Sequence, residues 1–265
     1  LFCCRKWDIL SIASVLLYTE LTDKNEWIRY MDGFLRAFNM LAQHNSELWQ
    51  IIGVTLSMSA LSTAFSAVIG VPLGIVMGMR NFCGKRLLMR LVNTFMGLPP
   101  VVVGLAVFLL LSRSGPFGGL RLLYSVPAMV IAQVLLITPV MVGLTASIVA
   151  ARAPAVRETA LGMGMRRISL LVNMLHECRG QIFSVLFTGF GRAISEVGAV
   201  SLVGGNVQYK TRVMTTAIML ETNRGNFEFA IALGAVLLLV SFMINSLALT
   251  LAERGQAGSA PRGGG

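Results

Sequence analysis

Residues 122–151 read LLYSVPAMVIAQVLLITPVMVGLTASIVAA and contain no charged side chain. A hydrocarbon core about 30 Å thick needs about 20 consecutive apolar residues in a helix that crosses it. Three other runs meet this condition without a charge, and a fourth meets it except for Arg192 and Glu196. These runs are 48–79, 91–111, 229–252 and 180–205. The sequence therefore predicts an all-α integral membrane protein with five transmembrane helices.

The overall composition agrees with a chain that lies in lipid. Of 265 residues, 55% are hydrophobic and 13% are charged, and the mean hydropathy is +0.74. A soluble domain carries about 25% charged residues. The net charge of +10 would favour nucleic acid only if Lys and Arg were clustered on one face. They lie instead in the gaps between apolar runs, so we expect a bilayer as the surroundings and no nucleic-acid partner.

The residues that usually build catalytic or metal sites are scarce. The four cysteines contain no CxxC pair, and the chain has two histidines, His44 and His176. Zinc sites and general acid–base sites draw mainly on these residue types. We therefore expect no metal site, no cofactor and no catalytic residue.

The basic residues predict an orientation. The loops after the first and third predicted helices hold more Lys and Arg than the other two loops. They contain Arg80, Lys85, Arg86 and Arg90, and then Arg152, Arg157, Arg166, Arg167 and Arg179. Because basic loops stay in the cytoplasm, the N-terminus is expected outside and the C-terminus inside.

Three parts are expected along the chain: an N-terminal segment at 1–47, a transmembrane domain at 48–252, and a disordered cytoplasmic tail at 253–265. The tail is rich in Gly, Ala, Pro and Ser. The apolar run Ile9–Tyr18 is too short to span a membrane. Met31 would be a natural start of the protein, and residues 1–30 would then be upstream sequence. The alternative is that residues 1–30 are a genuine N-terminal extension.

The third loop, 152–179, has a helix–turn–helix pattern. Glu158 follows Pro154 at the distance expected for a first helical turn, and Gly162 and Gly164 are expected to end that helix. A second short helix should follow on the cytoplasmic face. An ordinary amphipathic connection would show the same spacing.

Prolines interrupt two of the predicted spans. The GVPLG sequence at 70–74 is expected to kink or end the first span. Pro99 and Pro100 lack backbone N–H groups, so nearby carbonyls must find other partners or a polar cavity. Either a plain kink or a polar pathway would account for these two residues.

Arg192 and Glu196 are the only charges inside a predicted span. Their spacing of four places them on one face of a continuous helix. Each would cost about 2.5–3.5 kcal/mol at the bilayer centre. We therefore expect them to pair with each other or to face protein or water, as a structural ion pair or as a gate.

The end of the fourth span has a turn and a short helix. Gly204, Gly205 and Asn206 predict a sharp turn on the outer face, and Thr211–Glu221 a short helix after it. The helix either lies at the membrane interface or forms a platform for a partner protein.

Several of these stretches together resemble one family. Glu158, Ala160 and Gly164 match the E-x-A-x-x-x-G core of the cytoplasmic loop of ABC importer permeases, although Thr159 stands where a second alanine is usual. The LHECR sequence at 175–179 resembles the Leu-x-Glu-Ala-Arg variant of tungstate-type permeases. Further similar stretches are LPPVVVG at 98–104, SRSGP at 112–116, and parts of 191–206 and 211–222. From about residue 48 to 251 the chain resembles permeases of the molybdate, tungstate and sulfate group, with the tungstate type as the best match.

The resemblance implies a function and a set of partners. The chain would be the permease subunit of an ATP-driven importer that carries tungstate across a bacterial or archaeal cytoplasmic membrane. It would act as a homodimer with a dimer of ATPase subunits, which hydrolyse the ATP, and with an external oxyanion-binding protein. Molybdate or another oxyanion is the alternative substrate, and a secondary transporter or membrane scaffold is the alternative class.

The resemblance also assigns roles to residues. Those expected to couple to the ATPase are Glu158, Thr159, Ala160, Gly162 and Gly164. Those expected on the translocation path or its gate are Pro99, Pro100, Arg192 and Glu196. Those expected to dock the binding protein are Gly205, Asn206, Thr211 and Arg212.

Overall fold

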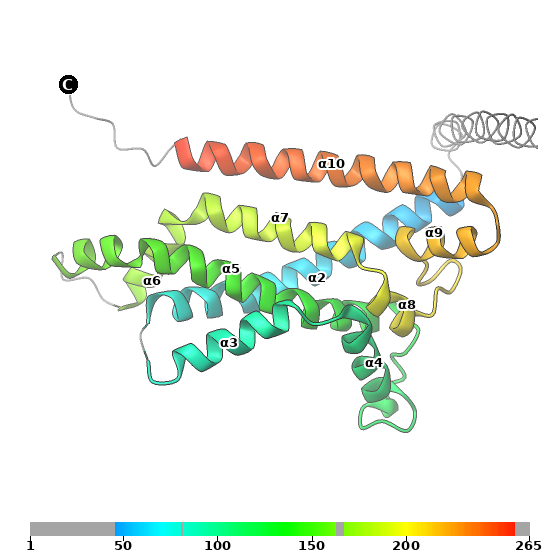
Figure 1. Ribbon diagram of the computed structural model, residues 1–265, viewed down its shortest axis with the longest axis horizontal. Helices are drawn as coiled ribbons and strands as arrows, with labels where there is room; N and C mark the ends of the chain where they lie inside the picture. Colours follow the sequence, from blue (N-terminus) through cyan, green and yellow to red (C-terminus); the bar gives the residue numbers. More distant parts are fainter. Residues whose placement is uncertain (1–45, 81, 163–166, 258–265) are drawn as a thin grey trace, which may run out of the picture.

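The computed structural model describes residues 46–80, 82–162 and 167–257, and this part of the chain is helical throughout its regular structure (Figure 1). The elements are α2 (Ser46–Met79), α3 (Lys85–Met96), α4 (Pro100–Leu111), η1 (Gly118–Leu120), α5 (Val126–Gly162), α6 (Arg167–Glu177), α7 (Arg179–Ser195), α8 (Gly198–Gly204), α9 (Met214–Asn223) and α10 (Phe227–Ala257). Three of these helices are long and apolar enough to cross a membrane, and two bent helix pairs raise the number of spans to as many as five. The all-α membrane architecture is confirmed.

Helices α2 and α5 run side by side at the centre and are joined by a seam of glycines. A Cβ atom on Gly70, Gly74 or Gly78 would stand 2.6–2.7 Å from a side chain of α5, namely that of Met141, Thr145 or Val149. Small residues at a spacing of four let two membrane helices approach closely. The 70–74 stretch therefore serves packing. Of the two alternatives expected for it, a kink or an end of the first span, the end is wrong, because α2 continues through Pro72.

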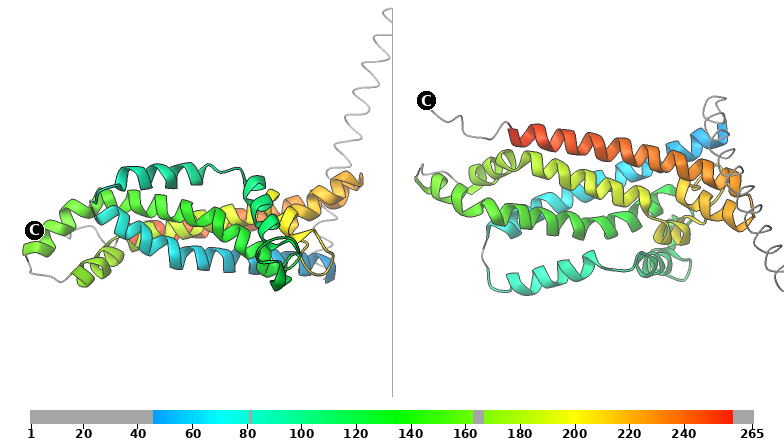
Figure 2. Two further views of the ribbon diagram at one scale, coloured as in Figure 1. Left: turned by 90° about the horizontal axis from the view of Figure 1, so that it is seen from below. Right: turned by 45° about the horizontal axis from the view of Figure 1, so that its top comes forward.

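Two predicted spans are broken rather than continuous. The axes of α3 and α4 meet at 95°, and those of α7 and α8 at 58°. Pro100 begins α4, where its missing N–H and fixed φ suit the first turn of a new helix. Figure 2 shows α3 beside α5, while α4 turns away from the direction of α3. The continuous helices expected at 91–111 and 180–205 are therefore corrected to bent pairs.

Helix α5 extends from the third span into the predicted loop. It contains Pro154, so this proline lies inside a helix and does not precede a new one. The neighbouring alanines have the highest helix propensity and keep the helix intact. The helix ends at Gly162, as predicted, and α6 is the expected second short helix. The turn at Gly164 lies outside the described residues.

The ends of the described chain differ slightly from the predicted domain limits. Helix α10 continues to Ala257, so residues 253–257 are helical and not part of a disordered tail. The segment 1–45, with the question of Met31, lies outside the described residues, as does 258–265.

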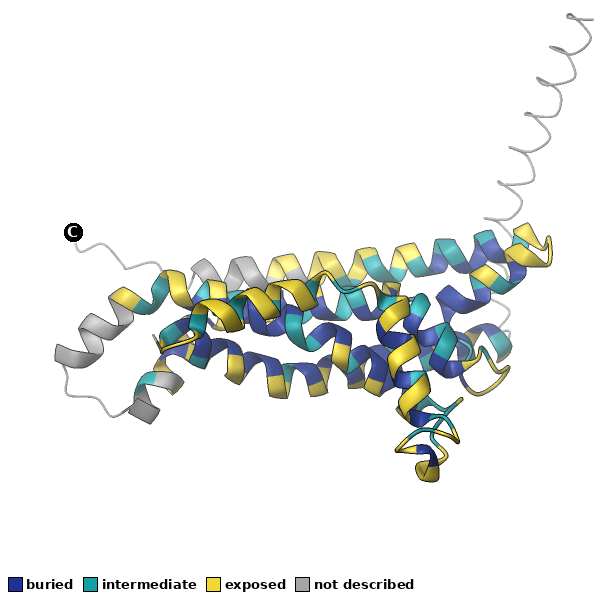
Figure 3. Cartoon of the chain, turned by 60° about the horizontal axis from the view of Figure 1, so that its bottom comes forward, coloured by how far each residue is buried: buried dark blue, intermediate teal, exposed yellow. Residues whose placement is uncertain are grey.

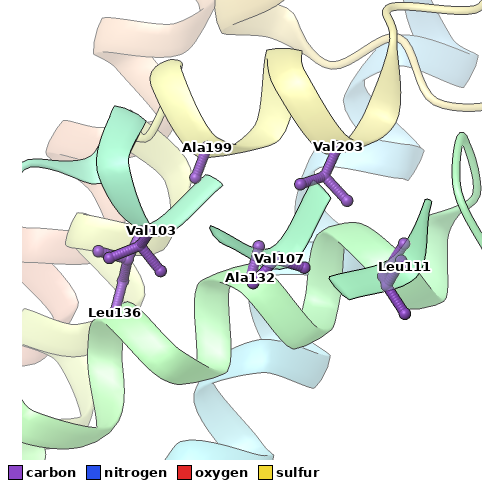
Figure 4. Packing of buried hydrophobic residues seen from close by; sticks show 8 residues of the cluster. Val103, Val107, Leu111, Ala132, Leu136, Ala199 and Val203 are labelled. Carbon is purple, nitrogen blue, oxygen red and sulfur yellow. The ribbon is translucent and has the colours of Figure 1, made fainter. Parts of the chain in front are cut away.

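Buried and exposed residues are distributed as the packing of the helices requires (Figure 3). The outer faces of α3, α4 and α10 expose large apolar side chains, for example Phe95, Leu109 and Phe242. The inner face of α4 packs on α5 and α8 through a cluster that Figure 4 shows close up: Val103, Val107, Leu111, Ala132, Leu136, Ala199 and Val203. The second halves of both broken spans thus pack together on α5.

Candidate functional site

The break between α7 and α8 is built around Glu196. Glu196 is buried and has an extended backbone (φ −73°, ψ 127°) just after the last residue of α7. Its Oε1 accepts a hydrogen bond from the backbone N–H of Ala199 at 3.2 Å. Its carbonyl oxygen accepts one from the Thr215 hydroxyl on α9 at 3.1 Å. The carboxylate therefore satisfies one of the N–H groups that a new helix leaves unpaired.

A fully buried glutamine supports the other side of the break. Gln133 of α5 donates from Nε2 to the carbonyl oxygen of Ala193, in the last turn of α7, at 2.8 Å. Its Oε1 accepts from the hydroxyl of Ser62 on α2 at 2.6 Å. Gln133 was not predicted as a site residue, although it is the one amide side chain in the uncharged run 122–151.

Arg192 and Glu196 do not form the predicted ion pair in the described chain. Because Glu196 lies beyond the end of α7, the spacing of four no longer places the two residues on one helix face. The Glu196 carboxylate binds the start of α8 instead. Arg192 is partly buried, and its Nε finds no hydrogen-bond partner within the described residues.

The proline break lies against the Glu196 break. Pro99 has an extended backbone, and its carbonyl oxygen accepts from the N–H of Val102 at 3.0 Å in the first turn of α4. A Cβ atom on Gly198 would lie 2.8 Å from the Cγ2 of Val101. Three of the four predicted path residues, Pro99, Pro100 and Glu196, thus lie on two tightly packed segments.

The turn after α8 has the backbone that the sequence predicted. Gly205 and Asn206 have positive φ of 67° and 49°. The Asn206 side chain exchanges hydrogen bonds with Thr216 at the start of α9, through Nδ2 at 3.4 Å and Oδ1 at 3.1 Å. Gly205 is exposed at this end of the bundle, whereas Asn206 is half-buried.

The other two predicted docking residues hold the turn in place. Thr211 is buried, and its hydroxyl donates to the Gly204 carbonyl oxygen at 2.6 Å and accepts from the Val207 N–H at 3.0 Å. Arg212 forms an ion pair of 3.1 Å with Glu47 at the start of α2. Thr211 has no exposed surface with which to contact a partner directly.

A polar cavity of about 260 Å³ opens beside this ion pair. Its walls carry both signs of charge, and they include an ion pair of 3.0 Å between Glu221 and Arg224. The lining residues are Glu47, Gln208, Arg212, Glu221, Arg224, Asn226 and Phe229. Apart from Arg212, none of these residues was predicted as a site residue.

The opposite end of the bundle carries the predicted coupling residues. Glu158, Thr159, Ala160 and Gly162 lie in the last turns of α5, and Gly164 lies outside the described residues. Also in α5, the Arg152 side chain donates from Nη1 to the Glu177 carbonyl oxygen at 3.1 Å. The pKa of the neighbouring Cys178 thiol is raised, chiefly because the thiol is buried. The charge of Arg152 lowers this pKa, and the charge of Glu177 raises it.

The described residues offer no metal site. Within 46–80, 82–162 and 167–257, no three His, Cys, Asp or Glu side chains come together in a way that could hold a metal ion.

Comparison with known proteins matches most of the chain. The family model of binding-protein-dependent transport system inner membrane components matches residues 70–254. A tungstate uptake system permease protein of Peptoclostridium acidaminophilum is 40% identical over 222 residues, 84% of this chain and 97% of that protein. A probable anion ABC transporter permease protein of Haloferax volcanii is 40% identical over 212 residues, 78% and 91% of the two chains.

More distant similarities share the fold. A sulfate transport system permease protein of Synechocystis is 27% identical over 204 residues, 74% of this chain and 73% of that protein. A chain of a bacterial alginate ABC transporter, solved with its periplasmic protein, superposes with a TM-score of 0.68 at 19% identity, covering 94% of this chain and 95% of that one. A chain of the MetNI methionine ABC transporter in inward-facing conformations gives 0.62 at 13% identity, covering 82% and 98%.

Proposed function

The chain belongs to the family of binding-protein-dependent inner membrane transport components, and we propose that it is the permease subunit of an ATP-driven importer of tungstate. Members of this family are transport components and not enzymes, and membership decides against a secondary transporter or a scaffold. One observation carries the choice of tungstate: the 40% identity that extends over 97% of a tungstate uptake permease. Because the Haloferax volcanii relative is named only for an anion, molybdate or another oxyanion is the second candidate.

The proposed assembly contains two copies of this chain, two ATPase subunits and an external oxyanion-binding protein. The apolar outer face of α4, with Val101, Leu105 and Leu109 exposed, supports contact with a second copy or with lipid. An alginate transporter of the same fold is described in complex with a periplasmic protein, which supports a binding protein as partner.

The proposed orientation has the N-terminus outside and the C-terminus inside the cytoplasmic membrane. The two most basic stretches are the end of α2 with the start of α3, and the end of α5 with α6. Both lie at the same end of the bundle, and so does the end of α10 (Figure 1). Basic loops favour the cytoplasmic side. The end with α9 would then face outward.

The proposed path passes the two helix breaks. Residues 97–99 and 196–197 interrupt the two bent pairs, and irregular backbone at membrane depth is tolerated where it is buried in protein or lines a cavity. Arg192 supports this placement, since it is the basic residue in the last turn of α7, directly before the break, and its side chain is only partly buried. Its positive charge would offset that of a passing dianion, while Pro99, Pro100 and Glu196 would shape the backbone beside it.

The proposed coupling element is the end of α5 together with the turn that follows it. Helix α5 has 37 residues and so extends for about 55 Å from the outward half of the bundle to Gly162. Movement of the ATPases would act on Glu158, Thr159, Ala160, Gly162 and Gly164. A continuous helix would carry that movement across the membrane.

The proposed docking surface for the binding protein is the outward end. Gly205 and Asn206 present the turn, and Arg212 lines the polar cavity. Thr211 would contribute by fixing the turn from inside. A cavity with both signs of charge suits a polar side chain projecting from the binding protein.

The test is uptake by the whole system. The chain would be expressed with its ATPase and binding protein in cells that lack their own oxyanion importers, and cellular tungsten, molybdenum and sulfur would be measured by mass spectrometry. Uptake of tungsten at low external tungstate, dependent on all three proteins, is the expected result. Preferential uptake of molybdate would select the second candidate, and no uptake of any oxyanion would contradict the proposal.

A further inference from the structure

Helices α2 and α5 are packed so closely that they should move together. The three seam glycines of α2 leave no space between the helices, because any Cβ there would overlap a side chain of α5. A packed interface of this kind resists sliding, since every shift along the axis creates overlap or a void. A displacement of α5 must therefore carry α2 with it.

Gln133 is a hydrogen-bonded link between this helix pair and the end of α7. The Ser62 hydroxyl lies 2.6 Å from Gln133 Oε1, with the Met58 carbonyl oxygen as a second acceptor at the same distance. The hydroxyl has one proton, so it is shared between the two acceptors, and its contact with Oε1 orients that end of the amide. The other end then donates from Nε2 to the Ala193 carbonyl oxygen at 2.8 Å.

The Ala193 carbonyl needs this partner. In the last turn of a helix, carbonyl groups have no N–H from a following turn. Ala193 is buried, so water does not reach its carbonyl oxygen as a substitute. The amide of Gln133 takes the place of the missing helical donor, which allows α7 to end at Ser195 inside the bundle.

The break is held from a second side as well. Glu196 lies three residues after Ala193, and its carbonyl oxygen is bound by Thr215 of α9. The break therefore lies between α5, through Gln133, and α9, through Thr215. Any movement of α5 relative to α9 must change the geometry at Glu196.

We infer that Gln133 is the positioning residue that makes the α7–α8 break move with the α2–α5 pair during transport. The inference rests on the proposed function, because it takes the end of α5 as the place where the ATPase acts. Movement would enter at Gly162, pass along α5 to Gln133, and reach Glu196 through the Ala193 carbonyl.

The test compares two replacements of similar length in the assembled transporter. Gln133→Met keeps an unbranched side chain but removes both hydrogen bonds. Gln133→Glu keeps both in its neutral form, which burial favours, because a carboxylic acid can accept from Ser62 and donate to the Ala193 carbonyl oxygen. The complex of this chain, its ATPase and its binding protein would be reconstituted in lipid vesicles, and the ratio of tungstate transported to ATP hydrolysed would be measured.

The expected result separates positioning from stability. A purely structural defect lowers both rates together through the amount of assembled complex and leaves the ratio unchanged. Gln133→Met should lower the ratio about fivefold or more, the usual size of an allosteric coupling. Gln133→Glu should keep the ratio within about twofold of wild type, because the net effect of retained hydrogen bonds is small.

Three results would overturn the inference: a wild-type ratio in Gln133→Met, equal loss in both variants, or failure of Gln133→Met to assemble, which would make the residue structural only. Failure of the proposed function is a different result, since the wild-type complex would then transport no tungstate.

Discussion

Gly104 of α4 lies directly against the backbone of Ala199 in α8: a Cβ atom on Gly104 would stand 2.6 Å from the Ala199 Cα. The second halves of the two broken spans cross at this point. The backbone of Ala199 leaves no space for a side chain at position 104. The relative placement of the proline break and the Glu196 break therefore depends on a glycine.

Gly104→Leu should disrupt this crossing. Overpacking of a well-packed core costs about 1–3 kcal/mol. We expect a lower thermal unfolding midpoint in detergent and a lower yield of assembled protein. Gly234→Ala is the matched control, because a Cβ there meets nothing within 4 Å and alanine favours the helix. An unchanged midpoint for Gly104→Leu would mean that α4 and α8 do not cross closely.

Arg192 and Glu196 should act independently. Because they form no ion pair in the described chain, a double-mutant cycle with Arg192→Ala and Glu196→Ala should give a coupling energy below about 0.5 kcal/mol in detergent unfolding. Arg192→Ala should lower tungstate uptake with little loss of folded protein. Glu196→Ala should cost about 1 kcal/mol of stability by removing a helix cap, and Glu196→Gln should retain most of it. A coupling energy well above about 0.5 kcal/mol would show that the two residues do form an ion pair.

Charge reversal at Glu158 should uncouple ATP hydrolysis from uptake. The residue lies in the last turns of α5, so Glu158→Lys should leave insertion and assembly intact while lowering the tungstate transported per ATP. Gly164→Val should act in the same direction, because the sequence predicts a turn at this glycine and a branched side chain would disfavour one. Glu177→Gln is the control, since it removes the charge of a pair of 3.8 Å in which Glu177 is exposed and Arg152 is half-buried. Normal uptake in both Glu158→Lys and Gly164→Val would show that this loop only connects two helices and does not couple to the ATPase.

Thr211→Val should destabilise the outward turn. The replacement keeps the shape but leaves the Gly204 carbonyl and the Val207 N–H without the hydroxyl. Buried groups left unpaired cost about 1–3 kcal/mol, so the unfolding midpoint should fall. Thr222→Val is the control, because that hydroxyl is exposed and bonds only within its own helix. Equal effects of the two changes would show that Thr211 is not a structural residue.

Cysteine labelling should report the orientation. Cys83 is exposed in the loop after α2, whereas Cys178 is buried. The thiolate is the reactive form, and burial raises the pKa of Cys178, so its thiol stays protonated at neutral pH. In a variant with Cys3 and Cys4 replaced by Ser, an impermeant maleimide should label Cys83 in inside-out vesicles and leave Cys178 unlabelled. Labelling of Cys83 in intact cells would reverse the proposed topology.

The sequence by itself determined that the chain is helical and lies in a membrane, and it determined the family. Uncharged runs of 20 or more residues have one stable solution in lipid, since a helix satisfies its backbone groups internally. The turn at Gly205 and the end of α5 at Gly162 were also predicted, because glycine carries a local conformational signal.

Only the tertiary structure decided where the spans break and which polar groups meet there. A hydropathy pattern treats each run as one helix, so it placed Arg192 and Glu196 on a common face and gave Gln133 no role. Whether a helix can end inside the membrane depends on donors and acceptors from other helices, here Gln133 and Thr215. These residues lie 60 and 19 positions from the carbonyl oxygens that they bind, and no local pattern joins them.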